Sequence, residues 1–285
     1  MQEYFEAVVL GLLQGFTEFL PISSSAHLRI FPEFFGWGDP GAAFTAVIQI
    51  GTELAVLIYF AKDIWRIANA WVRSLWQPRW RGHPDARMGW FVILGSLPIV
   101  LLGIALKDVI ESDFRSLWVI GTTLIVLGVI LGIADRVGST ERRIEQLTLP
   151  HALMYGAAQA LALIPGVSRS GATISMGRFL GYDREAATRF AFLLAIPAVI
   201  GAGLFELQEV VGCESGSAAE ACANSYGAMP TLVATIVSFV VGYAAIAWLL
   251  RYVTTHSYLP FVIYRILLGG VTLTLVATGV VPAGG

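Results

Sequence analysis

Long apolar segments dominate the hydropathy pattern of this chain. Each is close to the length of about 20 apolar residues that an α-helix needs to cross the hydrocarbon core of a bilayer. Charged residues fall mostly between these segments. The pattern therefore predicts six transmembrane helices, at residues 43–60, 88–106, 116–134, 187–207, 230–250 and 261–281.

Two further apolar segments, 5–35 and 152–180, are each interrupted by a proline and a group of polar residues. Pro21 and Pro165 lack an N–H group and disfavour helical geometry at the preceding residue. After Pro21, Ser23 or Ser24 can cap a new helix. Paired interrupted helices, one in each half of a chain, are typical of membrane proteins with a binding site near the bilayer centre. We therefore expect two re-entrant helical hairpins.

The distribution of basic residues predicts the orientation in the membrane. Segment 61–87 has six basic residues and two acidic ones, so we interpret it as a cytoplasmic loop. Segment 208–229 has no Lys or Arg, which places it outside the cytoplasm, where Cys213 and Cys222 can form a disulfide. Counting spans then places 107–115 outside, and 135–151 and the turn 251–260, next to Arg251 and Arg265, inside.

With this orientation the two halves of the chain cross the membrane in opposite directions. The predicted fold is an all-α integral membrane protein: an inverted-topology repeat of six transmembrane helices plus two re-entrant helical hairpins. We expect a single membrane domain over residues 1–285, with repeat one at about 1–135 and repeat two at about 150–285.

Composition excludes a soluble protein. The chain is 56% hydrophobic and 13% charged, with a mean hydropathy of +0.72, whereas a typical soluble domain has about 25% charged residues. Tryptophans alternate with arginines in segment 61–87, which we interpret as an aromatic belt at the membrane interface. We therefore expect no nucleic-acid partner. The N-terminus lacks the basic region of a secretory signal, so we expect no cleaved peptide.

Polar side chains gather at the two proline breaks. In an apolar setting they cost free energy unless they meet a ligand, an ion or each other. Arg169 offers a forked donor for phosphate oxygens, and helix N-termini present N–H groups to an anion. Glu18 can hold a divalent cation, since Mg²⁺ and Ca²⁺ both prefer oxygen ligands. The candidate residues are Gln14, Glu18, Ser23, Ser24, Ser25 and His27 at the first break, and Ser168, Arg169, Ser170 and Thr173 at the second.

Three motifs carry a resemblance to a known family: Gln14-x-x-x-Glu18, Pro21-Ile-Ser-Ser-Ser-Ala-His27 and Pro165-Gly-Val-Ser-Arg-Ser-Gly-Ala-Thr173. They resemble the bacterial undecaprenyl-diphosphate phosphatase (bacitracin-resistance) family over nearly the whole chain. The resemblance implies hydrolysis of undecaprenyl diphosphate to the monophosphate in the bacterial plasma (inner) membrane. This reaction recycles the lipid carrier of cell-wall synthesis and gives bacitracin resistance.

The resemblance also implies a dependence on Mg²⁺ or Ca²⁺. It implies that the activity depends on the positions of Gln14, Glu18, Ser24, His27 and Arg169. Known members often have Glu where Gln14 stands, Thr for Ser25 and Gly for Ala26. The first difference leaves open whether position 14 serves as a metal ligand in this chain.

We predict that Ser24 attacks the terminal phosphorus, that His27 takes or relays its proton, and that Glu18 and Arg169 complete the catalytic set. Attack by water or by His27 itself stays open. Glu53 has two open interpretations: it lines the pocket with Gln49, or it is solvated near the outer interface. We predict metal binding by Glu18 and Gln14, and substrate binding by Ser23, Ser25, Ser168, Ser170, Thr173 and Gln14.

A polyprenyl-phosphate flippase or transporter that uses the same site is the alternative hypothesis, because inverted repeats with broken helices are transporter architecture. An ion or proton channel is a weaker one. The hydroxyl cluster beside an imidazole favours the enzyme, since a carrier binds phosphate but needs no nucleophile. The expected partners are a lipid diphosphate substrate and membrane lipid, and a homodimer is left open.

Overall fold

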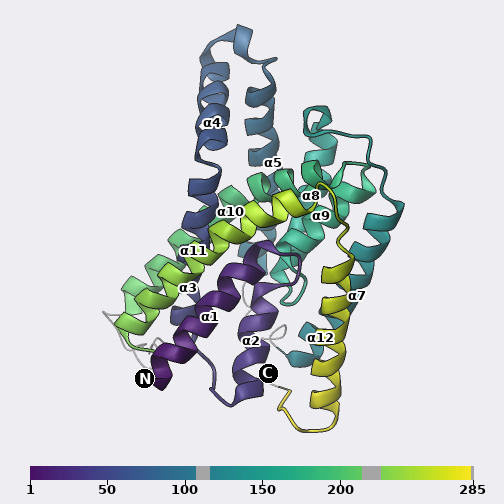
Figure 1. Cartoon of the computed structure of the whole chain (residues 1–285). Helices are drawn as coiled ribbons and strands as arrows, with labels where there is room; N and C mark the ends of the chain where they lie inside the picture. The colour runs from purple at the N-terminus through teal and green to yellow at the C-terminus, as the bar shows by residue number, and fades with distance from the viewer. Residues whose placement is uncertain (107–115, 214–225, 284–285) are drawn as a thin grey trace.

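The computed structural model describes residues 1–106, 116–213 and 226–283, except for the side chains of residues 42, 202 and 204–213. Every regular element in these ranges is helical (Figure 1). The α-helices are α1 (Gln2–Phe19), α2 (Ser24–Phe35), α3 (Ala42–Tyr59), α4 (Ala61–Trp76), α5 (Pro84–Ala105), α7 (Leu117–Val137), α8 (Leu149–Ala160), α9 (Arg169–Phe179), α10 (Arg184–Cys213), α11 (Ala228–Tyr252) and α12 (Leu259–Ala277). The 3₁₀ helices are η1 (Pro78–Trp80), η3 (Ile144–Gln146) and η4 (Leu161–Leu163).

Several of these helices have the length and composition of membrane spans. Among the described residues, α5, α7, α11 and α12 qualify alone, and α3 and α4 qualify together as a pair bent by 69°. They correspond to five of the six predicted spans, and α10 covers the sixth, 187–207. The prediction of an all-α integral membrane protein is therefore confirmed. The number of spans, the inverted arrangement and the repeat boundaries stay predictions.

Two segments that the sequence places outside the cytoplasm fall largely on residues that are not described. Residues 107–115 and 214–225 lie outside the described ranges, and Cys213 is the last residue of α10. The extracytoplasmic location of this loop and the pairing of Cys213 with Cys222 therefore stay predictions.

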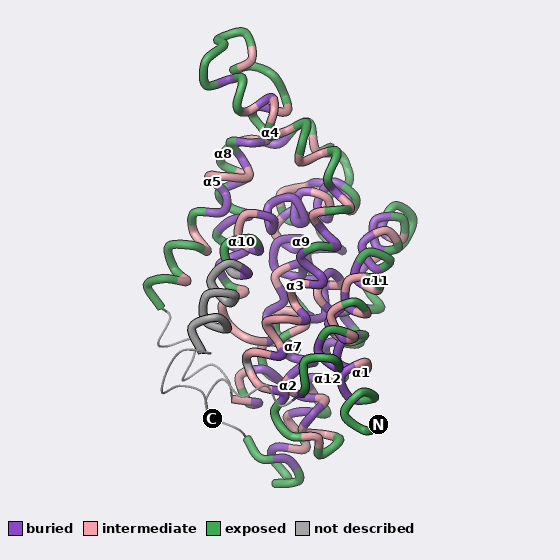
Figure 2. The backbone as a smooth tube through the Cα atoms, turned by 90° about the vertical axis from the view of Figure 1, so that its left-hand side faces the viewer, coloured by how far each residue is buried: buried purple, intermediate pink, exposed green. Residues whose placement is uncertain are grey.

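The prediction of a loop over residues 61–87 is wrong, because α4 covers residues 61–76 and α5 begins at Pro84. Residues 61–76 contain no glycine or proline, and their apolar side chains recur at helical spacing. One face of α4 packs on α5, where Gly89 lies against Trp71. The α4–α5 pair projects from one end of the molecule, and its tip is largely exposed (Figures 1 and 2). The basic residues indicate that the segment contacts a polar environment, and an exposed helix is as compatible with that as a loop.

The two interrupted segments are helical hairpins, α1–α2 and α8–α9. Phe5 near the start of α1 contacts Trp37 just beyond α2, with ring centroids 6.3 Å apart. His151 near the start of α8 forms a hydrogen bond of 2.7 Å with the Tyr182 hydroxyl just beyond α9. Each second helix thus returns to the side from which the first one came. The breaks lie at the closed ends of both hairpins, inside the bundle (Figure 1).

Close backbone approaches fix the first helix of each hairpin against a long helix of the other half. α1 packs along α11, and α8 packs along α5. Gly11 faces the backbone of Ala234 on α11, and Gly156 faces the backbone of Gly95 on α5. Small residues at such contacts let helix backbones approach closely, which is a common basis of helix packing in membranes.

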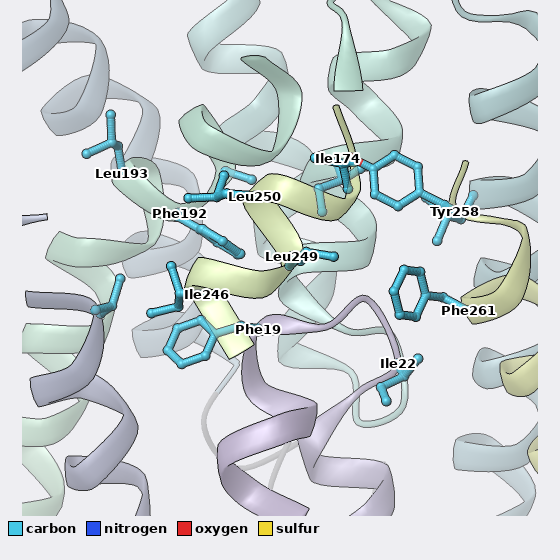
Figure 3. Packing of buried hydrophobic residues seen from close by; sticks show 14 of the residues in the cluster. Phe19, Ile22, Ile174, Phe192, Leu193, Ile246, Leu249, Leu250, Tyr258 and Phe261 are labelled. Carbon is cyan, nitrogen blue, oxygen red and sulfur yellow. The ribbon is translucent and has the colours of Figure 1, made fainter. Parts of the chain in front are cut away.

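A cluster of apolar side chains surrounds the first break. Phe19 and Ile22 flank Leu20 and Pro21, and they pack with Ile174 of α9 and Phe192 of α10 in one buried cluster (Figure 3). Residues of α3, α7, α11 and α12 also belong to it. The break is therefore held by side chains from both halves of the chain, which fixes the position of the polar residues that follow it.

A valine at position 156 should destabilise the protein. Its side chain would overlap the backbone of Gly95, and overpacking typically costs about 1–3 kcal/mol. The measurement is the midpoint of thermal unfolding of the purified protein in detergent. Gly270→Val on α12 is the matched control, because no atom lies within 4 Å of a Cβ there. Equal midpoints for the two variants would contradict the close α5–α8 contact.

Candidate functional site

The two breaks have the same local structure. Ser23 caps α2 and Ser168 caps α9, and each side chain accepts a hydrogen bond from the backbone N–H three residues later, on Ala26 and Gly171. Both serines have a positive φ, 75° and 68°, which is uncommon for a residue with a side chain. Such strained positions are often found at functional sites. The predicted helix cap is therefore present at the first break, and the second break has the same kind of cap.

Reciprocal hydrogen bonds join the two breaks. Gly166 N–H donates to Ser25 Oγ at 3.4 Å, and Ser170 Oγ donates to the carbonyl of Leu20 at 3.1 Å. Within each break the serine hydroxyls also pair, Ser23 with Ser25 and Ser168 with Ser170, both at 3.2 Å. These hydroxyls thus hold the turns and each other.

An ion pair between the two hairpins forms the centre of the site. Arg169 Nη2 lies 2.5 Å from Glu18 Oε1, and Ser24 Oγ donates to Glu18 Oε2 at 2.6 Å. Gln14 Nε2 donates to Glu18 Oε2 at 3.2 Å and to Thr52 Oγ1 at the same distance. Four of the predicted residues, Gln14, Glu18, Ser24 and Arg169, therefore meet around one carboxylate. The amide nitrogen of Gln14 faces Glu18, and its role as a metal ligand stays a prediction.

His27 does not contact Ser24 as its position three residues later led us to expect. Its Nδ1–H donates to the carbonyl of Ser23 at 2.6 Å. Its Nε2 lies 2.6 Å from the hydroxyl of Tyr264 on α12, so in the neutral ring Nε2 accepts that proton. Both ring nitrogens are thus engaged away from Ser24. The nearest group that can take the Ser24 proton is the Glu18 carboxylate.

Thr173, another predicted substrate ligand, is bonded within its own helix. Thr173 is fully buried, and its hydroxyl donates to the backbone carbonyls of Arg169 and Ser170 in the same helix. Ser168 and Ser170 are buried as well, whereas Ser25 is exposed. This geometry gives Thr173 a part in holding the first turn of α9. Its role in substrate binding stays a prediction.

A small cavity opens onto the ion pair. Glu18, Arg169 and Ser170 line its polar side, and Phe192 and Val199 of α10 are part of its apolar side. Glu53 of α3 is buried, which disfavours the interpretation that it is solvated at the outer interface. Gln49 donates to it at 3.3 Å, and its carboxylate occupies the space left open by Gly203 on α10. Glu53 is therefore an interior carboxylate one turn of α3 away from the cavity wall at Val56.

Sequence reasoning missed two neighbouring residues of α12. Tyr264 orients His27, and Arg265 is fully buried among backbone carbonyls of both breaks. From the sequence, Arg265 is only a charge next to the turn 251–260. Its location within the apolar segment 261–281 was the available signal, because ionisable residues inside a membrane segment usually have a function.

The residues present fit one kind of divalent-cation site. Within the described ranges, no group of three or more His, Cys, Asp or Glu side chains could hold a metal ion. Mg²⁺ is usually bound by one or two carboxylates together with substrate phosphates and water. Glu18, beside the Ser24 hydroxyl and the Gln14 amide, offers such a carboxylate. The donors therefore suit a cation shared with a phosphate ligand and do not form an all-protein cage.

The fold and site together define a class: an integral membrane protein with a polar site enclosed by two helical hairpins. Comparison with known proteins identifies the family. The chain belongs to the family described as Bacitracin resistance protein BacA, which matches residues 7–271. The resemblance inferred from the motifs is therefore confirmed.

Similar proteins from several bacteria cover the chain almost completely. It is 72% identical to an undecaprenyl-diphosphatase of a Nocardioides species, over 99% of this chain and 100% of that protein. It is 56% identical to an undecaprenyl-diphosphatase of Micrococcus luteus, over 98% of this chain and 99% of that protein. An undecaprenyl-diphosphatase 2 of Streptomyces coelicolor is 55% identical, over 97% of this chain and 96% of that protein.

Replacing Tyr264 with phenylalanine should leave His27 Nε2 without its hydrogen-bond donor. Loss of a buried hydrogen bond should lower the free energy of unfolding by about 1–2 kcal/mol. The ¹⁵N chemical shift of Nε2 should also change, while Nδ1 stays protonated and continues to donate to the Ser23 carbonyl. Thermal unfolding and NMR of ¹⁵N-histidine protein measure these effects, with Tyr243→Phe on the exposed side of α11 as the control. An unchanged Nε2 shift would contradict the Tyr264–His27 contact.

Proposed function

We propose that this protein is an integral membrane phosphatase that hydrolyses undecaprenyl diphosphate to undecaprenyl phosphate and inorganic phosphate. One observation carries the proposal: the Ser24 hydroxyl points its proton at Glu18, which is paired with Arg169 from the opposite hairpin. A nucleophile, a base and a phosphate-binding cation thus meet inside a membrane protein. The names of the relatives support the substrate.

Binding of the diphosphate falls to Arg169 and the two helix N-termini. Arg169 uses Nη2 for Glu18, and its planar fork carries further N–H donors for phosphate oxygens. Ser24 and Arg169 are the first residues of α2 and α9. The first N–H groups of a helix have no intrahelical partner, so both N-termini favour an anion. The apolar side of the cavity, with Phe192 and Val199, suits the start of a polyprenyl chain.

The chemical step follows from the Ser24–Glu18 hydrogen bond. Ser24 Oγ attacks the terminal phosphorus while its proton passes to Glu18. The bond from phosphorus to the bridging oxygen breaks, and undecaprenyl phosphate leaves. Water then hydrolyses the phosphoserine and releases inorganic phosphate. Arg169 stabilises the charge on the transferred group throughout.

In this scheme His27 orients the first break rather than relaying the serine proton. Its Nδ1–H group donates to the backbone carbonyl of the capping residue Ser23, which directly precedes Ser24. The hydroxyl of Tyr264 on α12 fixes the orientation of the ring. This revises the role we expected for His27 from the sequence. Direct attack by water and attack by His27 remain the rival routes, and the trapping experiment below separates them.

A divalent cation completes the proposal. Glu18 would hold Mg²⁺ or Ca²⁺ together with oxygens of the bound diphosphate, and the bound cation would neutralise phosphate charge. Gln14 would hold Glu18 in place through its amide N–H. A chelator should therefore lower phosphate release, and added Mg²⁺ or Ca²⁺ should restore it.

The cellular setting follows from the same proposal. We place the protein in the bacterial inner membrane, with segment 208–229 outside the cytoplasm, where it recycles the lipid carrier of peptidoglycan synthesis and gives bacitracin resistance. The homodimer stays a prediction. The relatives named above carry phosphatase names, which gives no support to the flippase alternative.

Phosphate release from a polyprenyl diphosphate by the purified protein in detergent tests the function. Arg169→Lys keeps the charge but loses the fork, so we expect about a tenfold or larger fall in kcat/KM. Arg189→Lys is the matched control, because Arg189 forms a comparable ion pair of 2.6 Å with Asp63 on α4. Absence of release by the wild type would refute the proposed function, and normal turnover of Arg169→Lys would remove Arg169 from the site.

Rapid quenching with labelled substrate identifies the nucleophile. We expect an acid-stable phosphoserine at position 24, and loss of most turnover in Ser24→Ala and in Glu18→Gln. The double variant should lose little more than either single one, because members of one catalytic unit are non-additive. Ser96→Ala on α5 is the control for a buried serine. An acid-labile phosphohistidine would move attack to His27, and an active Ser24→Ala without any covalent species would assign it to water.

A further inference from the structure

Arg265 is a fully buried arginine whose hydrogen bonds go to backbone carbonyls of three different segments. Nη1 donates to Pro21 at 3.2 Å in the first break. Nη2 donates to Gly166 and Val167, both at 3.0 Å, in the second break. Nε donates to Leu124 at 3.2 Å on α7. One side chain therefore binds both breaks and attaches them to the α7–α12 pair.

Pro21 and Val167 each lie within two residues of a strained capping serine, Ser23 or Ser168. Breaks leave carbonyl groups without helical partners, and an unpaired carbonyl in a membrane interior is costly. The planar, multi-donor guanidinium is suited to several carbonyls at once, whereas the ammonium group of lysine is not. The contacts of Arg265 thus explain how two positive-φ turns persist next to each other.

The charge of Arg265 has no counter-ion among the described residues. Among the side chains that the structure describes, which exclude those of residues 204–213, no carboxylate forms an ion pair with it. Arg169 is paired with Glu18. Arg178, the other fully buried arginine, lies 3.3 Å from Asp135 and also donates to backbone carbonyls. A buried charge without a counter-ion is costly, so the contrast between Arg178 and Arg265 needs an explanation.

The guanidinium of Arg265 packs against the first turn of α9. A Cβ placed on Gly171 would be 2.7 Å from Arg265 Nη1. Gly171 N–H donates to the capping Ser168, and Arg169 is the first residue of the same helix. The positive charge is therefore close to the N-terminus of α9, which favours an anion.

We propose that Arg265 is a positioning residue that holds both break turns in the geometry needed for phosphate transfer, and that its unpaired positive charge is balanced by the diphosphate when it binds. The proposal rests on the proposed function for the identity of the anion. It assigns two separate effects to one side chain. The hydrogen bonds set the geometry of Ser24 and Arg169, and the charge raises the affinity for the anion.

Two substitutions separate these effects. Arg265→Lys keeps the charge and loses the multi-carbonyl contacts, so kcat for phosphate release should fall about tenfold or more while affinity for the anion stays within about threefold of wild type. Arg265→Met removes the charge, so the affinity should fall about tenfold or more. The probe for affinity is inorganic pyrophosphate, measured by calorimetry on the full-length protein in detergent with chelator present.

Arg178→Met is the matched control, since it also removes a buried arginine from several carbonyls. It should lower the thermal unfolding midpoint about as much as Arg265→Met and leave pyrophosphate affinity unchanged. Wild-type affinity in a folded Arg265→Met, or no binding by wild type, would overturn the role of the charge. Wild-type kcat in Arg265→Lys would overturn the positioning role. If Arg265→Met does not fold, weakened pyrophosphate binding by folded Arg265→Lys contradicts the charge role, and retained binding supports it.

The experiment also distinguishes this inference from the proposed function. Arg265-dependent binding of pyrophosphate by a wild-type protein that releases no phosphate would reject the phosphatase and retain the anion role of Arg265. Normal phosphate release, together with pyrophosphate binding that does not depend on Arg265, would retain the phosphatase and reject the anion role of Arg265.

Discussion

Backbone groups at the two helix breaks must find hydrogen-bond partners inside an apolar bundle, and the rest of the structure follows from how they do so. Serines cap the second helix of each hairpin, and the hydroxyls of one break bond to the backbone of the other. Arg265 supplies the remaining donors to both. Each break therefore contributes hydrogen bonds to the other. The hydrogen bonds that satisfy the backbone at the breaks also bring the residues of the site together.

The same arrangement explains why the polar residues of the site survive in this setting. Glu18 and Arg169 come from different hairpins and neutralise each other at 2.5 Å. In the proposed reaction the diphosphate binds the N–H donors of Arg169 that do not contact Glu18. The ion pair thus keeps the carboxylate next to the Ser24 hydroxyl before a substrate arrives.

The family and its relatives add what geometry cannot supply, which is the identity of the lipid. A serine beside a carboxylate and an arginine is consistent with several phosphate esters and anhydrides. The match to the bacitracin-resistance family covers residues 7–271, so it includes both breaks and the α12 residues that hold them. Family membership and site geometry therefore support the same reaction from independent observations.

The sequence by itself determined the class of fold, the two hairpins and most residues of the site. The signals used are local. Long apolar segments act through hydration, prolines through the missing N–H group, and hydroxyl clusters through helix capping. The sequence did not determine α4, because its charges were compatible with either a helix or a loop. It also failed to place His27 and Arg265. Which hydrogen-bond partner a buried side chain finds depends on residues far away in the chain, Tyr264 for His27 and the two breaks for Arg265. Only the tertiary structure decides those contacts, since they form between segments whose separation in sequence carries no information about their distance in space.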